Sequence, residues 1–173
     1  MADEPGLLHF QHELMTRLGN ARAQPGGLGH AGFECAKQLF LLSLVDVRAI
    51  VMATDFARVP QAESTFPGLI NFQGELVGVI DPAPLLRQAS VISEAGGKGA
   101  VVILHKKFGL NVGLLTGRMV GLRDCQKWGS SPLDEAPEWV TSELVDEQGV
   151  HWRVIDPAAV LETMQAREFV PEA

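Results

Sequence analysis

The sequence predicts a mainly β protein with one helix near each end. From Ala31 onward, apolar residues come in short runs, which is the pattern of buried strands. The chain also holds 18 glycines and 10 prolines, and such frequent interruption favours short strands and turns over long helices. A length of 173 residues suits one medium domain or two small, closely packed ones.

The clearest local signal is a β-hairpin within residues 66–81. Two apolar strands, 69–72 and 76–80, flank the turn Gln73-Gly74-Glu75, whose central glycine can take the positive φ of a tight reversal. The second strand ends at Asp81-Pro82, because a proline cannot donate to a sheet ladder. We expect this hairpin to be buried on at least one side.

The N-terminal region is expected to be helical. In residues 5–19, Leu7, Leu14 and Leu18 share one face, and Gly19 is a suitable stop. Residues 20–30 are glycine-rich and read as a flexible connector, so residues 1–30 form a helical extension with its linker. The apolar face predicts that this helix packs on its own domain or on a partner.

Further elements are expected along the rest of the chain. A C-terminal helix at 157–167 should have Asp156 as its N-cap and Pro157 in its first position. A helical turn is expected at 82–88, with Leu85 and Leu86 facing inward, and surface loops are expected at 89–98 and 127–138. The other predicted strands are 33–35, 38–45, 48–53, 56–59, 100–104, 110–115, 118–122, 142–146 and 150–155.

One short sequence occurs twice. Val-Ile-Asp-Pro-Ala ends at Ala83 and again at Ala158, 75 residues later, and apolar residues follow both copies. Chance is one explanation, since a capped helical turn is a common way to end a strand. The other explanation is a pair of similar β subdomains, and the similar number of strands on either side of residues 89–98 favours it.

Charge and cysteine content exclude several classes of protein. The formal net charge is −7 and no basic run exists, so binding to nucleic acid is not expected. No apolar run has the length of a membrane span, and the acidic start, Met1-Ala2-Asp3-Glu4, does not resemble a signal peptide. Cys35 and Cys125 are far apart, as expected for buried thiols in a cytoplasmic protein.

No arrangement of residues typical of catalysis is found. His9 and His12 are three apart, but no further metal ligand has a recognisable spacing. Cys125 lacks a local nucleophile signature, and the glycines of 96–99 lack the full phosphate-loop pattern. We therefore expect no enzymatic activity, no metal site and no cofactor, and the apolar strands favour a binding module.

The hairpin also resembles the hallmark of CheW-type domains. The stretch from Gly68 to Asp81 is similar to the family pattern G-hydrophobic-x-N-hydrophobic-R-G followed by apolar residues and V-I-D. Further blocks that match in order and spacing are Pro60, 100–104 with 112–115 and 119–122, and 154–156. The resemblance covers about residues 31–165. The length and the N-terminal extension are most similar to the PilI-type adaptor of type IV pilus chemosensory systems, which control twitching motility.

This resemblance implies a fold and a role. The fold is two packed SH3-like β-barrels of five strands each, within a CheW-like domain at 31–170 that divides near 89–98. The implied role is a non-enzymatic scaffold or adaptor for chemotaxis-type signal transduction. It would link methyl-accepting chemoreceptors to a CheA-type histidine kinase of a two-component system.

The resemblance also implies two binding surfaces. The tip of the receptor would lie in a groove between the barrels, and an exposed barrel surface would pair with the homologous domain of the kinase. By position, the groove candidates are Val47, Ala49, Ile50, Gly68, Asn71, Gln73 and Gly74. The chain departs from the family pattern at four positions: the usual arginine is Gln73, a usual glutamate is Ala49, a usual aspartate is Gly117 and a usual proline is Gly78.

Two alternatives belong to other classes. A divergent CheW-like β-barrel that binds a small ligand would contain a closed apolar cavity with convergent polar groups. An enzyme would use Cys125 or a histidine.

Overall fold

The computed structural model describes residues 29–53, 57, 59–60, 63–88 and 99–168. The helix expected at 5–19 and the loop expected at 89–98 lie outside the described residues, as do most of the connector and part of the strand expected at 56–59. The strands are β1 (His30–Cys35), β2 (Gln38–Ser43), β3 (Val47–Ala53), β4 (Gly68–Phe72), β5 (Glu75–Ile80), β6 (Gly99–Leu104), β7 (Val112–Thr116), β8 (Met119–Arg123), β9 (Gly129–Ser131), β10 (Val140–Val145) and β11 (His151–Ile155). The helices are the short 3₁₀ helices η1 (Leu44–Asp46), η2 (Ala83–Leu86) and η3 (Lys106–Phe108), and the α-helix α3 (Pro157–Glu168).

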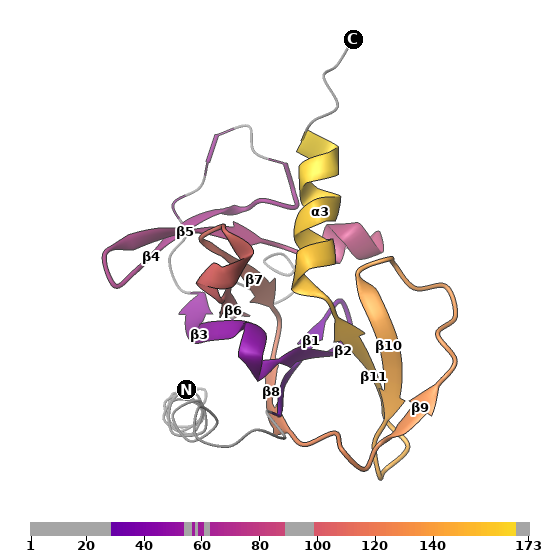
Figure 1. The fold of residues 1–173 in the computed structure, drawn as a ribbon. Helices are drawn as coiled ribbons and strands as arrows, with labels where there is room; N and C mark the ends of the chain where they lie inside the picture. Colours follow the sequence, from indigo (N-terminus) through magenta and orange to yellow (C-terminus); the bar gives the residue numbers. More distant parts are fainter. Residues whose placement is uncertain (1–28, 54–56, 58, 61–62, 89–98, 169–173) are drawn as a thin grey trace.

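The strands form two sheets, which confirms the expected mainly β fold. One sheet has five strands in the order β3-β6-β7-β5-β4, and the other has six in the order β8-β1-β2-β11-β10-β9. In Figure 1, β3 to β5 lie to the left and β9 to β11 to the right, while α3 rises between them. The C-terminal helix contributes Val160, Leu161 and Met164 to the core that contains residues of both sheets.

The two sheets repeat one pairing pattern. In the five-stranded sheet, the hairpin β4–β5 pairs in parallel through β5 with β7 of the hairpin β6–β7. In the other sheet, the hairpin β10–β11 pairs in parallel through β11 with β2 of the hairpin β1–β2. The two Val-Ile-Asp-Pro-Ala segments end β5 and β11, which are equivalent strands. The repeated sequence therefore marks two similar β units.

Both repeated aspartates cap the segment that follows them. An oxygen of Asp81 accepts a hydrogen bond from the amide of Ala83, and Asp156 accepts one from Ala158, each over 2.9 Å. The expected N-cap of the C-terminal helix is thus confirmed, with Pro157 in the first helical position. The first segment continues only as the short helix η2, in which Leu85 is buried and Leu86 is partly buried.

One hydrophobic core joins the two sheets. It contains Phe33 and Phe40 from the six-stranded sheet, Val102 from the five-stranded sheet and Met164 from α3. All six residues of β6 are buried, because this strand has neighbours on both sides and is covered on both faces. The continuous apolar run at 100–104 follows from this position.

Each sheet is strongly curled. Arg48 on β3 lies 5.3 Å from the ring centroid of Phe72 on β4, although these strands are opposite edges of the five-stranded sheet. In the six-stranded sheet, Arg123 on β8 lies 5.5 Å from the ring centroid of Trp152, three strands away on β11. These cross-sheet contacts give each unit a barrel-like form.

Two features differ from the sequence-based expectation. The loop expected at 127–138 contains β9, which pairs with β10 and gives one sheet a sixth strand. This strand has the sequence Gly-Ser-Ser and pairs through its backbone, so no run of apolar residues predicts it. The expected division of the chain near 89–98 does not coincide with the division into sheets, because β3 to β7 share one sheet while β1 and β2 join the C-terminal strands.

Candidate partner-binding site

The seven groove candidates all lie in the five-stranded sheet or its turn, but they differ in exposure. Val47 and Ile50 of β3 are 3% and 1% exposed and belong to the core, and Gly68 is buried at the start of β4. Ala49 is partly buried and packs against the core. The exposed candidates are Asn71, Gln73 and Gly74, which the structure brings together at the β4–β5 turn.

This turn is tight and has a defined conformation. Gln73 and Gly74 have φ angles of 53° and 82°, so both central residues are left-handed, as the twist of a two-residue hairpin requires. The side-chain oxygen of Asn71 accepts a hydrogen bond from the Gly74 amide over 3.1 Å. The positive φ expected at Gly74 is confirmed, and the turn presents an exposed polar end of the sheet.

Glu75 follows this turn directly and forms two ion pairs. One carboxylate oxygen lies 2.7 Å from Nη1 of Arg48 on β3, and the other lies 2.6 Å from Nζ of Lys106 in η3. Hydrogen bonds from Lys106 and then from Arg48 lower the pKa of Glu75 below its ordinary value. We term this three-residue arrangement the Glu75 clamp.

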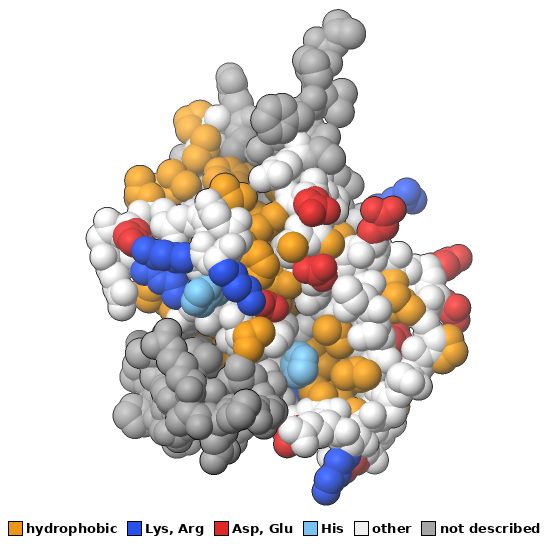
Figure 2. Space-filling model, viewed as in Figure 1, with side chains coloured by type: hydrophobic (Ala, Val, Ile, Leu, Met, Phe, Trp, Pro, Cys, Tyr) orange, Lys and Arg blue, Asp and Glu red, His pale blue; other side chains and the backbone are white. Residues whose placement is uncertain are grey.

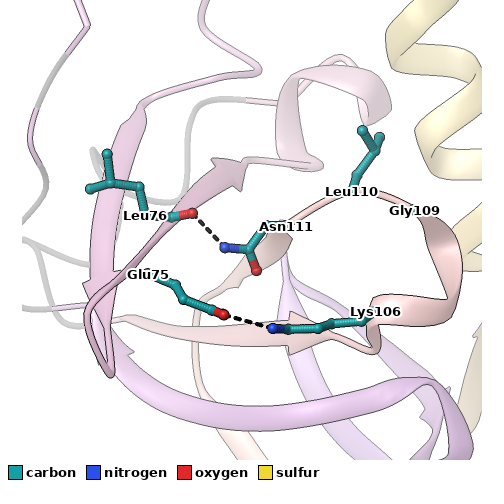
Figure 3. A pocket seen from close by; sticks show the side chains of 6 residues that line it. All are labelled: Glu75, Leu76, Lys106, Gly109, Leu110 and Asn111. Carbon is teal, nitrogen blue, oxygen red and sulfur yellow. Dashed lines mark hydrogen bonds and ion pairs between the residues drawn. The ribbon is translucent and has the colours of Figure 1, made fainter.

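A surface depression of about 480 Å³ lies beside the clamp. We term it the turn pocket, and it is lined by Glu75, Leu76, Lys106, Gly109, Leu110 and Asn111. Figure 3 shows that these residues come from β5 and from the connection between β6 and β7, and that Glu75 reaches across to Lys106. The side-chain amide of Asn111 donates a hydrogen bond to the carbonyl of Leu76 and joins the two segments.

The turn pocket combines apolar groups with paired charges. Leu76 is 62% exposed and Leu110 is 39% exposed, which is unusual for leucines so close together. Its lining also holds the ion pair of Lys106 with Glu75, and the neighbouring Lys107 is paired with Asp46. Figure 2 shows basic side chains gathered on the face in view although the chain carries a net charge of −7. A surface of this composition suits contact with another protein.

Sequence reasoning missed most of this pocket. Lys106 was expected only as part of a turn, and Glu75 only as the end of the hairpin turn. The ion pairs of Glu75 join residues that are 27 and 31 positions apart, and no local pattern predicts such pairs. One residue could have indicated the pocket from the sequence. Leu76 is an apolar residue that begins the predicted strand 76–80, and no packing partner was expected for it.

The other candidate groups have ordinary structural roles. His105 accepts a hydrogen bond from the amide of Lys107 at the start of η3, and His151 lies 2.6 Å from Glu143. Burial raises the pKa of the Cys125 thiol to about 11, which makes it a weak nucleophile at neutral pH.

No metal-binding cluster or membrane-spanning helix is found in the described part of the chain. Among these residues, no group of three His, Cys, Asp or Glu side chains could hold a metal ion. His9 and His12 lie outside the described residues. None of the described helices is long and apolar enough to span a membrane.

Comparisons with known proteins found one matching family profile and similar solved structures. The family profile for the CheW-like domain matches residues 30–165. The fold is similar to the crystal structure of the scaffolding protein TtCheW from Thermoanaerobacter tengcongensis, with a TM-score of 0.59 and 16% sequence identity. This similarity covers 78% of the present chain and 87% of that chain, and at such low identity it concerns the fold alone. Among curated proteins, no sequence matches.

Proposed function

The chain belongs to the CheW-like domain family, and from this premise we propose that it is a non-enzymatic scaffold. It would couple methyl-accepting chemoreceptors to a CheA-type histidine kinase. The observation that carries this proposal is the family match over residues 30–165, which spans both β units. The proposed site of action is the cytoplasm, where the receptor tips and the kinase would meet.

The exposed end of the five-stranded sheet supports a role in protein binding. Asn71, Gln73 and Gly74 form a polar turn next to the exposed leucines of the turn pocket. Protein interfaces commonly combine apolar contacts with a polar rim, whereas small-ligand sites are enclosed. The turn pocket is a surface depression bordered by the exposed Leu76 and Leu110, so it favours a protein partner over a small ligand.

The finer assignment is to a type IV pilus pathway. Residues 1–30 precede the CheW-like domain, and their predicted helix is similar to the extension of PilI-type adaptors. This similarity supports our proposal that the chain acts in twitching motility rather than in flagellar chemotaxis. The receptor groove would include Ala49, Asn71, Gln73 and Gly74, with Val47, Ile50 and Gly68 supporting it from within the sheet.

Binding to each partner separately tests this function. A purified receptor cytoplasmic fragment and the CheW-like domain of a CheA-type kinase would be titrated with the chain by calorimetry. We expect saturable binding to both, and an unrelated acidic protein of similar size serves as the control. Absence of binding to both partners at tens of micromolar contradicts the proposal.

A further inference from the structure

The end of the β4–β5 hairpin extends beyond the sheet that supports it. β5 pairs with β7 only from Gly78 to Ile80, so Glu75, Leu76 and Val77 have no β7 partner. β4 is an edge strand, and the isolated bridge from Ala57 reaches it at Leu69, away from the turn. Among the described residues, backbone pairing therefore does not fix the turn relative to the rest of the sheet.

Side chains supply this missing connection. Glu75 joins the hairpin to β3 through Arg48 and to η3 through Lys106, over 2.7 Å and 2.6 Å. Arg48 also covers the ring of Phe72, the residue before the turn. Asn111 adds a hydrogen bond to the carbonyl of Leu76. The turn is thus held from two directions, and both ion pairs meet at one carboxylate.

We propose that Glu75 is a positioning residue, which holds the β4–β5 turn in the orientation that a receptor tip binds. This inference rests on the proposed function and identifies a residue outside the groove candidates. The clamp favours one orientation of Asn71, Gln73 and Gly74 before the partner arrives. A preorganised turn loses less conformational freedom on binding than a mobile one.

The main alternative is an ordinary surface ion pair without consequence. The Glu75 side chain is 39% exposed and the Lys106 side chain is 59% exposed, and exposed pairs contribute little to stability. The two explanations differ in what they predict for binding. An inconsequential pair leaves receptor affinity unchanged, whereas a positioning clamp changes affinity while global stability stays nearly constant.

The chain offers a matched control for the removal of Glu75. Glu34 lies in β1 of the other sheet, pairs with Arg118 over 3.1 Å and is 36% exposed. Glu75→Gln and Glu34→Gln therefore remove the same charge from ion-paired carboxylates of similar exposure. A general effect of net charge would appear equally in both variants.

Receptor affinity is the decisive readout. We expect Glu75→Gln to weaken binding of the receptor fragment by about threefold to tenfold. The expected loss of receptor affinity is this small because the clamp can contribute no more free energy than the amount by which it favours the bound orientation of the turn. Glu34→Gln should stay within about twofold of the wild type. Binding of the kinase domain and the thermal midpoint should be nearly unchanged in both variants.

A double-mutant cycle with Lys106→Gln separates positioning from direct contact. If Lys106 acts through Glu75, its substitution should have little further effect in the Glu75→Gln background. The amide of Gly78 donates a hydrogen bond to the carbonyl of Asn111 and links the hairpin to the β6–β7 connection. Its hydrogen exchange should also become faster in Glu75→Gln, without any partner present.

The outcomes separate this inference from the proposed function. Wild-type affinity in Glu75→Gln, an equal loss in Glu34→Gln, or additive effects of Glu75→Gln and Lys106→Gln would each overturn the positioning role. A wild-type chain that binds neither receptor nor kinase contradicts the proposed function instead. In that case, unchanged hydrogen exchange at Gly78 in Glu75→Gln would still overturn the clamp.

Discussion

At the scale of single residues, two departures from the family pattern have a packing reason. Gly78 stands where proline is usual; its amide donates a hydrogen bond to the carbonyl of Asn111 over 2.9 Å, and a Cβ there would lie 3.0 Å from the ring of Phe66. Gly117 stands where aspartate is usual, and its Cβ would lie 3.0 Å from the carbonyl oxygen of Glu34. The ring of Phe66 and the carbonyl of Glu34 occupy the space that a proline or an aspartate side chain would need at these positions.

Gly113 of β7 permits a still closer approach. A Cβ at this position would collide with the side chain of Val101 and lie 3.3 Å from the Cα of Ile103. We expect Gly113→Ala to lower the free energy of unfolding by about 1–3 kcal/mol, because an added methyl overpacks a filled core. Urea denaturation measures this change.

Gly129 is the matched control for this substitution. It also lies in a strand, β9, but an added Cβ there meets no atom within 4 Å. Gly129→Ala should therefore leave the urea midpoint nearly unchanged. Equal destabilisation by the two substitutions would show that close packing at Gly113 is not the cause.

At the scale of the elements, the start of α3 depends on one side chain. Asp156 accepts a hydrogen bond from the amide of Ala158 over 2.9 Å, and α3 buries Val160, Leu161 and Met164 in the shared core. Asp156→Ala should lower the free energy of unfolding by about 1 kcal/mol, because an amide of the first turn loses its acceptor. Thermal denaturation followed by circular dichroism measures this effect.

The asparagine variant tests the cause of that loss. Asp156→Asn keeps an oxygen that can accept the same hydrogen bond, so it should cost clearly less than Asp156→Ala. If both substitutions cost the same, the negative charge rather than the hydrogen bond stabilises the start of α3.

The turn between β10 and β11 should make stability depend on pH. Asp146 accepts hydrogen bonds from the amide of Val150, from the indole of Trp152 and from the amide of Gln148, which lower its pKa. A lowered pKa in the folded state means that acid destabilises the fold. The contribution is complete above the ordinary aspartate pKa of about 3.9 and is lost as the pH falls below it.

Substitution of Asp146 tests this dependence. Between about pH 5 and pH 2, the urea midpoint of Asp146→Asn should fall less steeply than that of the wild type. Asp134→Asn removes a carboxylate from the exposed loop before β10 and controls for the loss of one negative charge. Equal slopes for Asp146→Asn and the wild type would contradict this role of Asp146.

The β4–β5 hairpin shows how far the sequence can predict an element and its site. Its strands and the left-handed Gly74 follow from local residue types, and both are confirmed. Its ion pairs with Arg48 and Lys106 depend on the curl of the whole sheet, which no local pattern encodes. The turn was therefore predictable, whereas the clamp and most of the turn pocket were not.

At the scale of the whole molecule, the sequence predicted two β units but not which strands form each of them. The repeated Val-Ile-Asp-Pro-Ala segments correctly indicated two similar units. The N-terminal hairpin β1–β2, however, completes the sheet formed by the C-terminal strands. The packing of the shared core decides such long-range pairing, because an apolar strand could pair equally well with several other strands. The backbone-held strand β9 was missed because its residues are small and polar.

The central claim is that the molecule joins a receptor to a kinase, and co-sedimentation tests it most directly. Receptor fragments assembled on vesicles would be mixed with a CheA-type kinase, with and without the chain. We expect kinase sedimentation to rise saturably as the chain is added, while the chain itself sediments with the receptor. Kinase sedimentation that is unchanged by the bound chain, or that falls as the chain is added, would contradict the account.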